Sequence, residues 1–447
     1  MELIVEPRWL IPVDPPGVWY TDHAVLVRDG RIIEVGPVAH LTDTVPAAPR
    51  VRLPSHALIP GLVNAHTHAA MTLLRGFADD LPLDRWLREH IWPAEQALVG
   101  GAFVDVGSRL AMAEMLLGGT TCFNDMYMFP DVVAEAAERL GIRAAIGLIV
   151  FDFPTAWART TEEYLDRADE LIDRFRNHAT VHPLLAPHAP YTVSDAALAQ
   201  VEARSSQHGL AVHIHLHETA HEVASAVASD GRRPFARLEA LGLINERLLA
   251  VHATQLTEHE IARLAEVKAS VAHCPESNLK LASGFCPVTR LQAAGVNLGL
   301  GTDGAASNND LDLLGEMRTA ALLAKGVSGD PEALPAASVL HMATLGGARA
   351  LGLDDHIGSI APGKAADMVA LDLGRLQTQP VYDPISHVVY ATGREQVSHV
   401  WVSGAPRVVD GVLTQIDQPG LLAEVEAWRE RIRATVGTDM APEGGRR

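Results

Sequence analysis

The chain has 447 residues, enough for one barrel of about 250 residues and a smaller companion domain. Apolar residues make up 48% and charged residues 20% of the sequence, a mixture typical of chains that bury a large core. The formal net charge of −19 opposes binding to phosphate backbones and anionic lipid surfaces, so we expect neither a nucleic-acid nor a membrane partner.

Cysteine usage and hydropathy indicate the compartment. The three cysteines, Cys122, Cys274 and Cys286, form neither a CxxC pair nor an even disulfide framework. No basic segment followed by a long apolar stretch opens the chain, and no apolar run reaches the roughly 20 residues that cross a bilayer. These features predict a cytoplasmic protein.

Residues 1–60 and 366–418 carry short strand patterns with tight turns. Asp29-Gly30 separates two alternating apolar runs in HAVLVRDGRIIEVGP, as a hairpin turn does. Asp410-Gly411 follows another alternating run near the opposite end of the chain. We therefore predict that the two chain ends share one sheet.

Residues 61–365 alternate short apolar strands with helical segments, the pattern of repeated βα units. The predicted strands include RAAIGLIVF, TVHPLLAP, LAVHIHLHE, LLAVHA, ASVAHC and VNLGLGTD. The pattern predicts an α/β fold of the (β/α)8 barrel type. In residues 419–447, apolar side chains at helical spacing predict a helix that packs on the body or on a partner subunit, followed by a loose tail.

The first of four polar clusters is NAHTH, in which His66 and His68 stand two residues apart at a strand end. Residues two apart on a strand point to the same side, so both imidazoles can reach one ion. Two-residue spacing is common by chance, and the prediction therefore depends on the other clusters.

The second cluster, HIHLHET, places three histidines on alternating positions. We predict that His215 is a metal ligand, and that Glu218 transfers protons beside the metal without occupying a coordination site. His213 and His217 are then assigned to packing or to the layer behind the ligands.

Two further clusters end later strands. His252 closes LLAVHA, where a structural role is the alternative, and Asp303 follows VNLGLGT between glycines that allow close backbone approach. A barrel places its active-site groups at the carboxyl ends of its strands, so the four clusters predict a common site. Three imidazoles and one carboxylate suit zinc, although iron(II), manganese or nickel accept the same ligands. We predict a single metal, because the strand TVHPLLAPHAPYT lacks a lysine that could be modified to bridge two ions.

The motifs PGLVNAHTH, HIHLHET, AVHATQ, AHCPESNLKLASG and GTDGAASNN occur in this order and resemble the amidohydrolase superfamily. The segment AHTHAAMTLLRGFADDLPLDRWLREHIWPAE is similar to the branch that contains methylthioadenosine/S-adenosylhomocysteine deaminases and triazine hydrolases. The resemblance implies a barrel over 61–365 with a small β-sandwich built from 1–60 and 366–418. It also implies a homo-oligomer.

The same resemblance implies roles for individual residues. It implies metal ligation by His66, His68, His215 and Asp303, proton transfer by Glu218, and a water- or leaving-group-directed role for His252. It implies substrate contacts by Trp86, Glu95 and His188, with Glu95 accepting both ribose hydroxyls. Arg75, Arg159, His273 and Ser277 are weaker candidates, because surface or loop hydrogen bonding explains them equally well.

The predicted reaction is zinc-dependent hydrolytic deamination of 5′-methylthioadenosine or S-adenosylhomocysteine to an inosine-type product and ammonia. An aminohydrolase or chlorohydrolase acting on guanine, an oxidised purine or a triazine is the nearest alternative, since the same metal site serves all of them. A catalytically silent relative is a third possibility, although every position expected in an active enzyme is filled.

Overall fold

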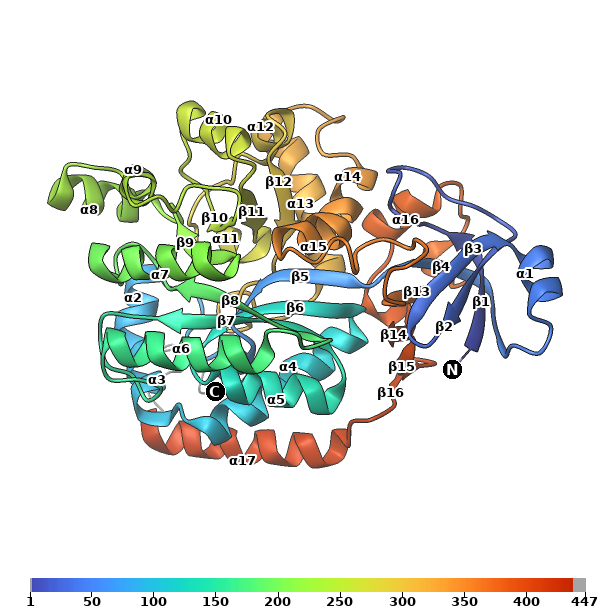
Figure 1. Ribbon diagram of the computed structural model, residues 1–447, viewed down its shortest axis with the longest axis horizontal. Coiled ribbons are helices and arrows are strands. Elements are labelled where there is room, and N and C mark those ends of the chain that lie inside the picture. The colour runs from blue at the N-terminus through green and yellow to red at the C-terminus, as the bar shows by residue number, and fades with distance from the viewer. Residues whose placement is uncertain (1, 437–447) are drawn as a thin grey trace, which may run out of the picture.

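The structure is a computed structural model that describes residues 2–436. It contains two eight-stranded sheets (Figure 1). In the first, neighbouring strands in chain order pair in parallel, and most of their residues are buried. Its strands are β5 (Leu62–Thr67), β6 (Thr120–Tyr127), β7 (Arg143–Val150), β8 (Val181–Pro187), β9 (Val212–Leu216), β10 (Leu248–His252), β11 (Ser270–His273) and β12 (Asn297–Leu300).

Hydrogen bonds close this sheet between its first and last strands. The Asp303 N–H, just beyond β12, donates to the His66 carbonyl over 3.0 Å, and the Thr302 N–H donates to Asn64 Oδ1 over 3.1 Å. Gly301 lies so close to β5 that an added Cβ would stand 2.8 Å from His66 Cβ. The predicted TIM-type barrel is confirmed.

Helices cover the barrel because parallel strands must bury both faces. The helices that follow the strands or cover the barrel are α4 (Gly101–Leu117), α5 (Pro130–Leu140), α6 (Thr161–Phe175), α7 (Asp195–His208), α8 (Ala220–Asp230), α9 (Pro234–Ala240), α10 (Glu258–Glu266), α11 (Pro275–Lys280), α12 (Val288–Ala293), α13 (Leu313–Ser328), α14 (Ala336–His341), η3 (Met342–Gly346) and α15 (Gly347–Ala350). After β5 the chain forms η1 (Ala69–Leu74), α2 (Leu83–Arg85), the π-helical η2 (Trp86–Ile91) and α3 (Trp92–Leu98). The segments α2, α3, α8 and α9 gather at the end of the barrel opposite the second sheet (Figure 1).

The second sheet combines both chain ends, as predicted. It runs in the order β16-β15-β14-β13-β4-β1-β2-β3, and the pairing of β13 with β4 joins the late strands to the early ones. Asp29 and Gly30 have φ values of 47° and 81°, which form the predicted hairpin turn. The elements are β1 (Glu2–Leu10), β2 (His23–Arg28), β3 (Arg31–Pro37), α1 (Val38–Thr44), β4 (Arg50–Pro60), β13 (Met368–Asp372), η4 (Leu376–Thr378), α16 (Pro384–Tyr390), η5 (Arg394–Gln396), β14 (Val397–Val402), β15 (Ala405–Val409) and β16 (Val412–Leu413).

The last helix, α17 (Gln418–Val436), packs on the barrel body rather than standing free. Trp428 is buried and meets the Phe103 ring of α4 edge to face at 5.3 Å. The tail predicted after this helix lies outside the described residues. Among residues 2–436, no helix is both long enough and apolar enough to cross a bilayer.

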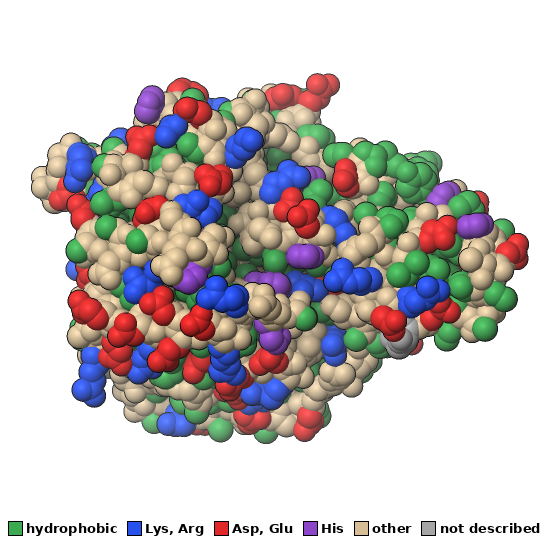
Figure 2. All heavy atoms as spheres, in the orientation of Figure 1, with side chains coloured by type: hydrophobic (Ala, Val, Ile, Leu, Met, Phe, Trp, Pro, Cys, Tyr) green, Lys and Arg blue, Asp and Glu red, His purple; other side chains and the backbone are tan. Residues whose placement is uncertain are grey.

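The surface shows how the net negative charge is distributed. Figure 2 shows acidic and basic side chains interspersed over the barrel face that it presents, with apolar side chains gathered over the end that holds the second sheet. This face therefore has no extended basic patch of the kind that binds a polyanion. Cys122, Cys274 and Cys286 are buried and unpaired.

Candidate active site

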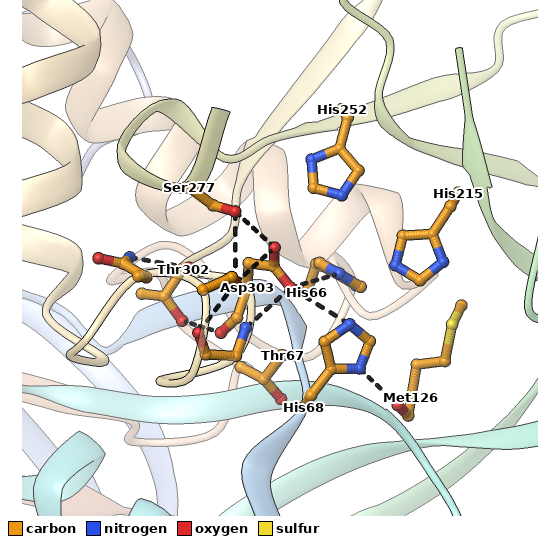
Figure 3. A network of polar contacts seen from close by, with 12 residues as sticks. His66, Thr67, His68, Met126, His215, His252, Ser277, Thr302 and Asp303 are labelled. Carbon is orange, nitrogen blue, oxygen red and sulfur yellow. Dashed lines mark hydrogen bonds and ion pairs between the residues drawn. The ribbon is translucent and has the colours of Figure 1, made fainter. Parts of the chain in front are cut away.

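The four polar clusters meet at the carboxyl end of the barrel (Figure 3). His66 lies within β5, His68 follows it, His215 lies in β9 and His252 ends β10, whereas Asp303 stands three residues beyond β12. Asp303 Oδ1 is 3.3 Å from His66 Nε2 and 3.2 Å from His68 Nε2. The ligand atoms of His66, His215 and His252 also lie within 4.8 Å of one another. The structure therefore brings together residues that are up to 237 positions apart.

Hydrogen bonds behind the imidazoles decide which nitrogen each one presents. His68 Nδ1 donates to the Met126 carbonyl over 2.6 Å, and His215 Nδ1 donates to the His188 carbonyl over 2.7 Å. Both rings therefore present Nε2 to the centre. Metal-binding histidines commonly use their second nitrogen in this way, because it fixes the ring orientation.

His66 fits the same pattern through a side chain. Its Nδ1 lies 2.9 Å from His213 Nε2, and Asn124 Nδ2 lies 3.2 Å from His213 Nδ1. His66 Nε2 is buried and faces the Asp303 carboxylate, whose Oδ1 lies 3.3 Å away. A buried polar nitrogen needs a partner, and a metal ion would satisfy it together with the carboxylate. The donor set therefore fits a divalent ion.

Hydroxyl groups and a backbone N–H orient the Asp303 carboxylate. Asp303 Oδ2 accepts hydrogen bonds from Ser277 Oγ over 2.6 Å and from Ser307 Oγ over 2.9 Å, and Oδ1 accepts from the Gly304 N–H over 2.8 Å. Burial opposes the charged form, but hydrogen bonds and charge interactions with His66 and His68 hold the pKa of Asp303 well below its ordinary value. Asp303 is thus anionic and ready to ligate a cation.

Glu218 and His252 lie close to each other beside this cluster. His252 Nδ1 donates to Asn278 Oδ1 over 2.9 Å, so Nε2 is the nitrogen that can accept a proton. His252 Nε2 lies 3.8 Å from Glu218 Oε2. Burial raises the pKa of Glu218 above its ordinary value, although the nearby His252 lowers it. A carboxyl group with a raised pKa can act as a proton donor near neutral pH.

Several residues in and next to the site adopt an uncommon backbone conformation. His217, His252, Ala253 and Asp303 all adopt positive φ, between 50° and 70°. Non-glycine residues adopt this conformation at an energetic cost, and it clusters where side chains must be aimed. All four are site residues or immediate neighbours of site residues.

A pocket opens over the cluster. One end of the pocket is polar and consists of His68, His215, Glu218, His252 and Asp303, and the rest is mainly apolar and aromatic. Trp86, Glu95 and His188, which the sequence predicted as substrate contacts, all line it.

Glu95 lies in the part of the wall formed by the helical segments after β5. Tyr127 Oη, at the end of β6, donates to Glu95 Oε1 over 2.6 Å. Burial raises the pKa of Glu95 to about 7, although the Tyr127 hydrogen bond lowers it. Trp86 starts the π-helix η2, an irregular helix type often found at functional sites.

His188 presents an acceptor to the pocket. Its Nδ1 donates to Thr192 Oγ1 over 2.9 Å, and the Thr192 hydroxyl itself donates to the Ala189 carbonyl. Burial is the main cause that lowers the pKa of His188 to about 3, so the ring is neutral and its Nε2 can accept a hydrogen bond.

An outer groove continues from the pocket. Six side chains line both spaces, namely Leu83, Leu87, Trp92, Tyr191, Glu218 and Leu281. Tyr191 is 51% exposed at this junction. A ligand in the pocket can therefore extend outward between these six side chains, which we call the collar.

The weaker candidates lie outside the described pocket lining. Arg75 donates to Glu114 and to the Asn309 carbonyl, and thus bridges an acid and a loop. Arg159 has an exposed side chain, whereas Ser277 supports Asp303 and His273 is buried. His217 is also buried, with Nε2 accepting from the Phe235 N–H over 3.2 Å, and it packs as predicted.

Sequence reasoning missed three residues that the structure places around the site. Tyr127 reaches Glu95, Asn278 orients His252, and Ser307 supports Asp303. Tyr127 is the last residue of a barrel strand, and this position could have identified it as a candidate site residue. Asn278 and Ser307 lie in loops and short helices, and only the folded chain shows which side chain they contact.

Comparison with known proteins extends these observations. The model of the amidohydrolase family matches residues 57–407.

The chain belongs to the amidohydrolase family.

Amidohydrolases with high similarity to this chain include curated deaminases. A 5-methylthioadenosine/S-adenosylhomocysteine deaminase of Teredinibacter turnerae is 46% identical over 430 residues, which cover 96% of this chain and 97% of that protein. The corresponding protein of Thermodesulfovibrio yellowstonii is 41% identical, with coverage of 96% and 98%. The predicted superfamily and branch are confirmed.

Solved structures of amidohydrolases share the fold. An adenosine deaminase from Xanthomonas campestris with bound zinc matches with a TM-score of 0.96 and 54% identity, covering 97% of this chain and 99% of that chain. The atrazine chlorohydrolase TrzN from Arthrobacter aurescens matches with a TM-score of 0.90 at 24% identity, covering 96% and 100%. At that identity the second match concerns the fold alone.

Proposed function

We propose that this amidohydrolase is a zinc-dependent hydrolytic deaminase of adenine nucleosides that acts on 5′-methylthioadenosine and S-adenosylhomocysteine. The observation that carries the proposal is the placement of Glu218 and His252 beside the buried His and Asp cluster, at one end of a pocket that contains Glu95. The names of the similar deaminases and the zinc in the Xanthomonas structure support it.

One zinc ion would be held by His66, His68, His215 and Asp303. When bound, zinc lowers the pKa of a water molecule toward neutrality and so supplies the nucleophile for hydrolysis. Asp303 or His252 would take up the proton of the attacking water; the hydrogen bond of His252 Nδ1 to Asn278, which leaves Nε2 as the acceptor, supports this role.

Glu218 would supply a proton to the purine. Burial raises its pKa, which favours the protonated carboxyl group. It would donate to the ring nitrogen next to the amino-bearing carbon, so that negative charge does not accumulate there. The proton taken from the attacking water would pass to the amino group, the carbon–nitrogen bond would break, and ammonia would leave an inosine-type product, while the second water proton would restore the Glu218 carboxyl group.

The rest of the pocket recognises the nucleoside. Glu95 would accept the two ribose hydroxyls, Trp86 would cover an apolar face of the ligand, and His188 Nε2 would accept a hydrogen bond. The collar around Tyr191 and the outer groove provide space for a long 5′ substituent. This space favours thio-nucleosides over compact free bases.

The decisive experiment measures ammonia release by zinc-loaded protein from methylthioadenosine, S-adenosylhomocysteine, adenosine, guanine and a triazine. We expect rapid turnover of the 5′-thio-nucleosides and a loss of about 10³-fold or more in kcat for Glu218→Gln, with zinc content unchanged. Turnover of guanine or a triazine without turnover of any nucleoside would assign the chain to the alternative aminohydrolase function. We also propose a homo-oligomer, which sedimentation equilibrium would test.

A further inference from the structure

The turn that carries Glu218 has an unusual second carboxylate behind it. Glu222 is the third residue of α8, whose N-cap Thr219 accepts a hydrogen bond from the Glu222 N–H over 3.1 Å. Glu222 lies along the outer groove but does not line the described nucleoside pocket. It therefore does not face the part of the pocket in which the proposed reaction takes place.

The Glu222 carboxylate binds the backbone on both sides of the strand-to-helix turn. Its Oε1 accepts from the His217 N–H over 3.1 Å, and its Oε2 accepts from the Glu218 N–H over 2.7 Å. The Thr219 N–H also hydrogen-bonds to it. In an ordinary capping box, a glutamate at this helix position accepts only from the N-cap residue. Glu222 reaches one and two residues further back, to the N–H groups of Glu218 and His217.

No cation competes for this carboxylate. Among residues 2–436, Glu222 forms no ion pair with a lysine, arginine or histidine, and its carboxyl oxygens are satisfied by the N–H groups of the turn. Burial raises the pKa of Glu222 to about 7, although these hydrogen bonds lower it. The hydrogen bonds hold His217 at φ 54°, a conformation that a non-glycine residue does not adopt readily.

The opposite side of the same turn is also fixed. Thr254 Oγ1 donates to the Glu218 carbonyl over 2.7 Å, and the Thr254 N–H donates to the His217 carbonyl over 3.0 Å. Among residues 2–436, the Glu218 carboxyl group accepts one hydrogen bond from a hydroxyl, that of Ser283 Oγ over 3.3 Å. The direction of the Glu218 side chain thus depends mainly on its backbone.

We propose that Glu222 is a positioning residue that holds the backbone of residues 217–219 and thereby aims Glu218 at the reacting atoms. The inference rests on the proposed role of Glu218 in deamination. A displacement of about 1 Å in a proton donor can reduce turnover by about 100-fold, whereas substrate binding at Glu95 and Trp86 would be unaffected.

The chain contains a matched control in α6. Glu163 is also the third residue of its helix, its N–H donates to the N-cap Thr160, and its carboxylate accepts from the Arg159 N–H over 2.8 Å. No residue of that turn lines the described pocket. Glu163→Ala therefore removes comparable capping chemistry without disturbing a proton donor.

The test compares Glu222→Ala, Glu222→Gln and Glu163→Ala in zinc-loaded protein. We expect Glu222→Ala to lower kcat by about 10- to 100-fold while KM changes by less than about threefold. Glu222→Gln, which retains one acceptor oxygen, should recover part of the loss, and Glu163→Ala should keep kcat within about twofold. Equal kcat values for Glu222→Ala and Glu163→Ala would overturn the proposal.

Hydrogen exchange gives a second readout that needs no substrate. Peptides covering residues 212–222 should exchange faster in Glu222→Ala than in wild type, and unchanged exchange would also overturn the proposal. If wild-type protein deaminates no nucleoside, the proposed function fails, but the exchange measurement still decides whether Glu222 holds the turn. If Glu222→Ala does not fold, both measurements are made on Glu222→Gln.

Discussion

The two ends of the pocket are built in different ways. At the metal end, histidines stand on or next to strands, and backbone carbonyls orient His68 and His215. At the opposite end, where we propose that ribose binds and which we call the ribose end, Trp86 and Glu95 lie on the irregular helical segments η2 and α3, and a side chain, Tyr127, orients Glu95. Backbone carbonyls thus fix side chains of the metal end, whereas Glu95 depends on a contact with another side chain.

The largest effect is expected from breaking the metal end. His215→Ala removes a proposed ligand and should lower both zinc content and activity, with kcat/KM falling by about 10⁴-fold or more. Metal analysis and the ammonia assay measure the two losses. His182→Gln, at the amino end of β8, is the control and should retain zinc. Full zinc occupancy and activity in His215→Ala would remove His215 from the ligand set.

A smaller effect is expected at the ribose end. Glu95→Gln keeps the shape of the side chain but removes the charge that would accept two hydroxyls, so kcat/KM for methylthioadenosine should fall by about 10- to 100-fold. Steady-state kinetics should show the loss mainly in KM, with zinc content unchanged. An unaffected KM would favour a free-base or triazine substrate.

A residue behind the metal end should have a moderate effect. Asp125 is buried, and its Oδ1 accepts from the Ala69 N–H over 2.6 Å and from Thr67 Oγ1 over 3.2 Å, so it supports the chain around His68. Asp125→Ala should weaken zinc binding by about 10-fold, as measured by competition with a chelator. Asp125→Asn retains an acceptor and should bind zinc more tightly than Asp125→Ala. Equal zinc affinity in wild type and Asp125→Ala would show that Asp125 does not contribute to zinc binding.

The smallest effect concerns stability and pH. The pKa of Glu95 is about 7 in the native protein, above the ordinary value of 4.5, so the native state binds its proton more tightly than the unfolded state. Its contribution to stability is fully present below pH 4.5 and is lost as the pH rises through 7. Glu95→Gln should therefore raise the free energy of unfolding at pH 8 by about 1–3 kcal/mol, and change it less at pH 5.

Denaturant unfolding of wild type and Glu95→Gln at both pH values measures this difference. Glu163→Gln serves as the control, because the Glu163 carboxylate is exposed and the pKa of Glu163 is lowered by the hydrogen bond from the Arg159 N–H rather than raised. A stability gain for Glu95→Gln that is equal at pH 5 and pH 8 would show that removal of the charge is not its cause.

The sequence by itself determined the parts that depend on short-range patterns. Alternating apolar strands followed by helices indicated the barrel, and strand ends such as those at His66, His215 and His252 indicated the site. The hairpin at Asp29-Gly30 follows from local turn chemistry, since both residues adopt positive φ. These features depend on neighbours within a few residues, and they are therefore readable along the chain.

Only the tertiary structure decided which residue contacts which across the barrel. The sequence could not show that His213 contacts the His66 ring. Nor could it show that Asn278 orients His252 or that Tyr127 reaches Glu95. It also gave no sign that the Glu222 carboxylate turns back to the Glu218 backbone. These contacts join separate strands or depend on the exact course of a turn, and such geometry is set by barrel closure and packing rather than by local sequence.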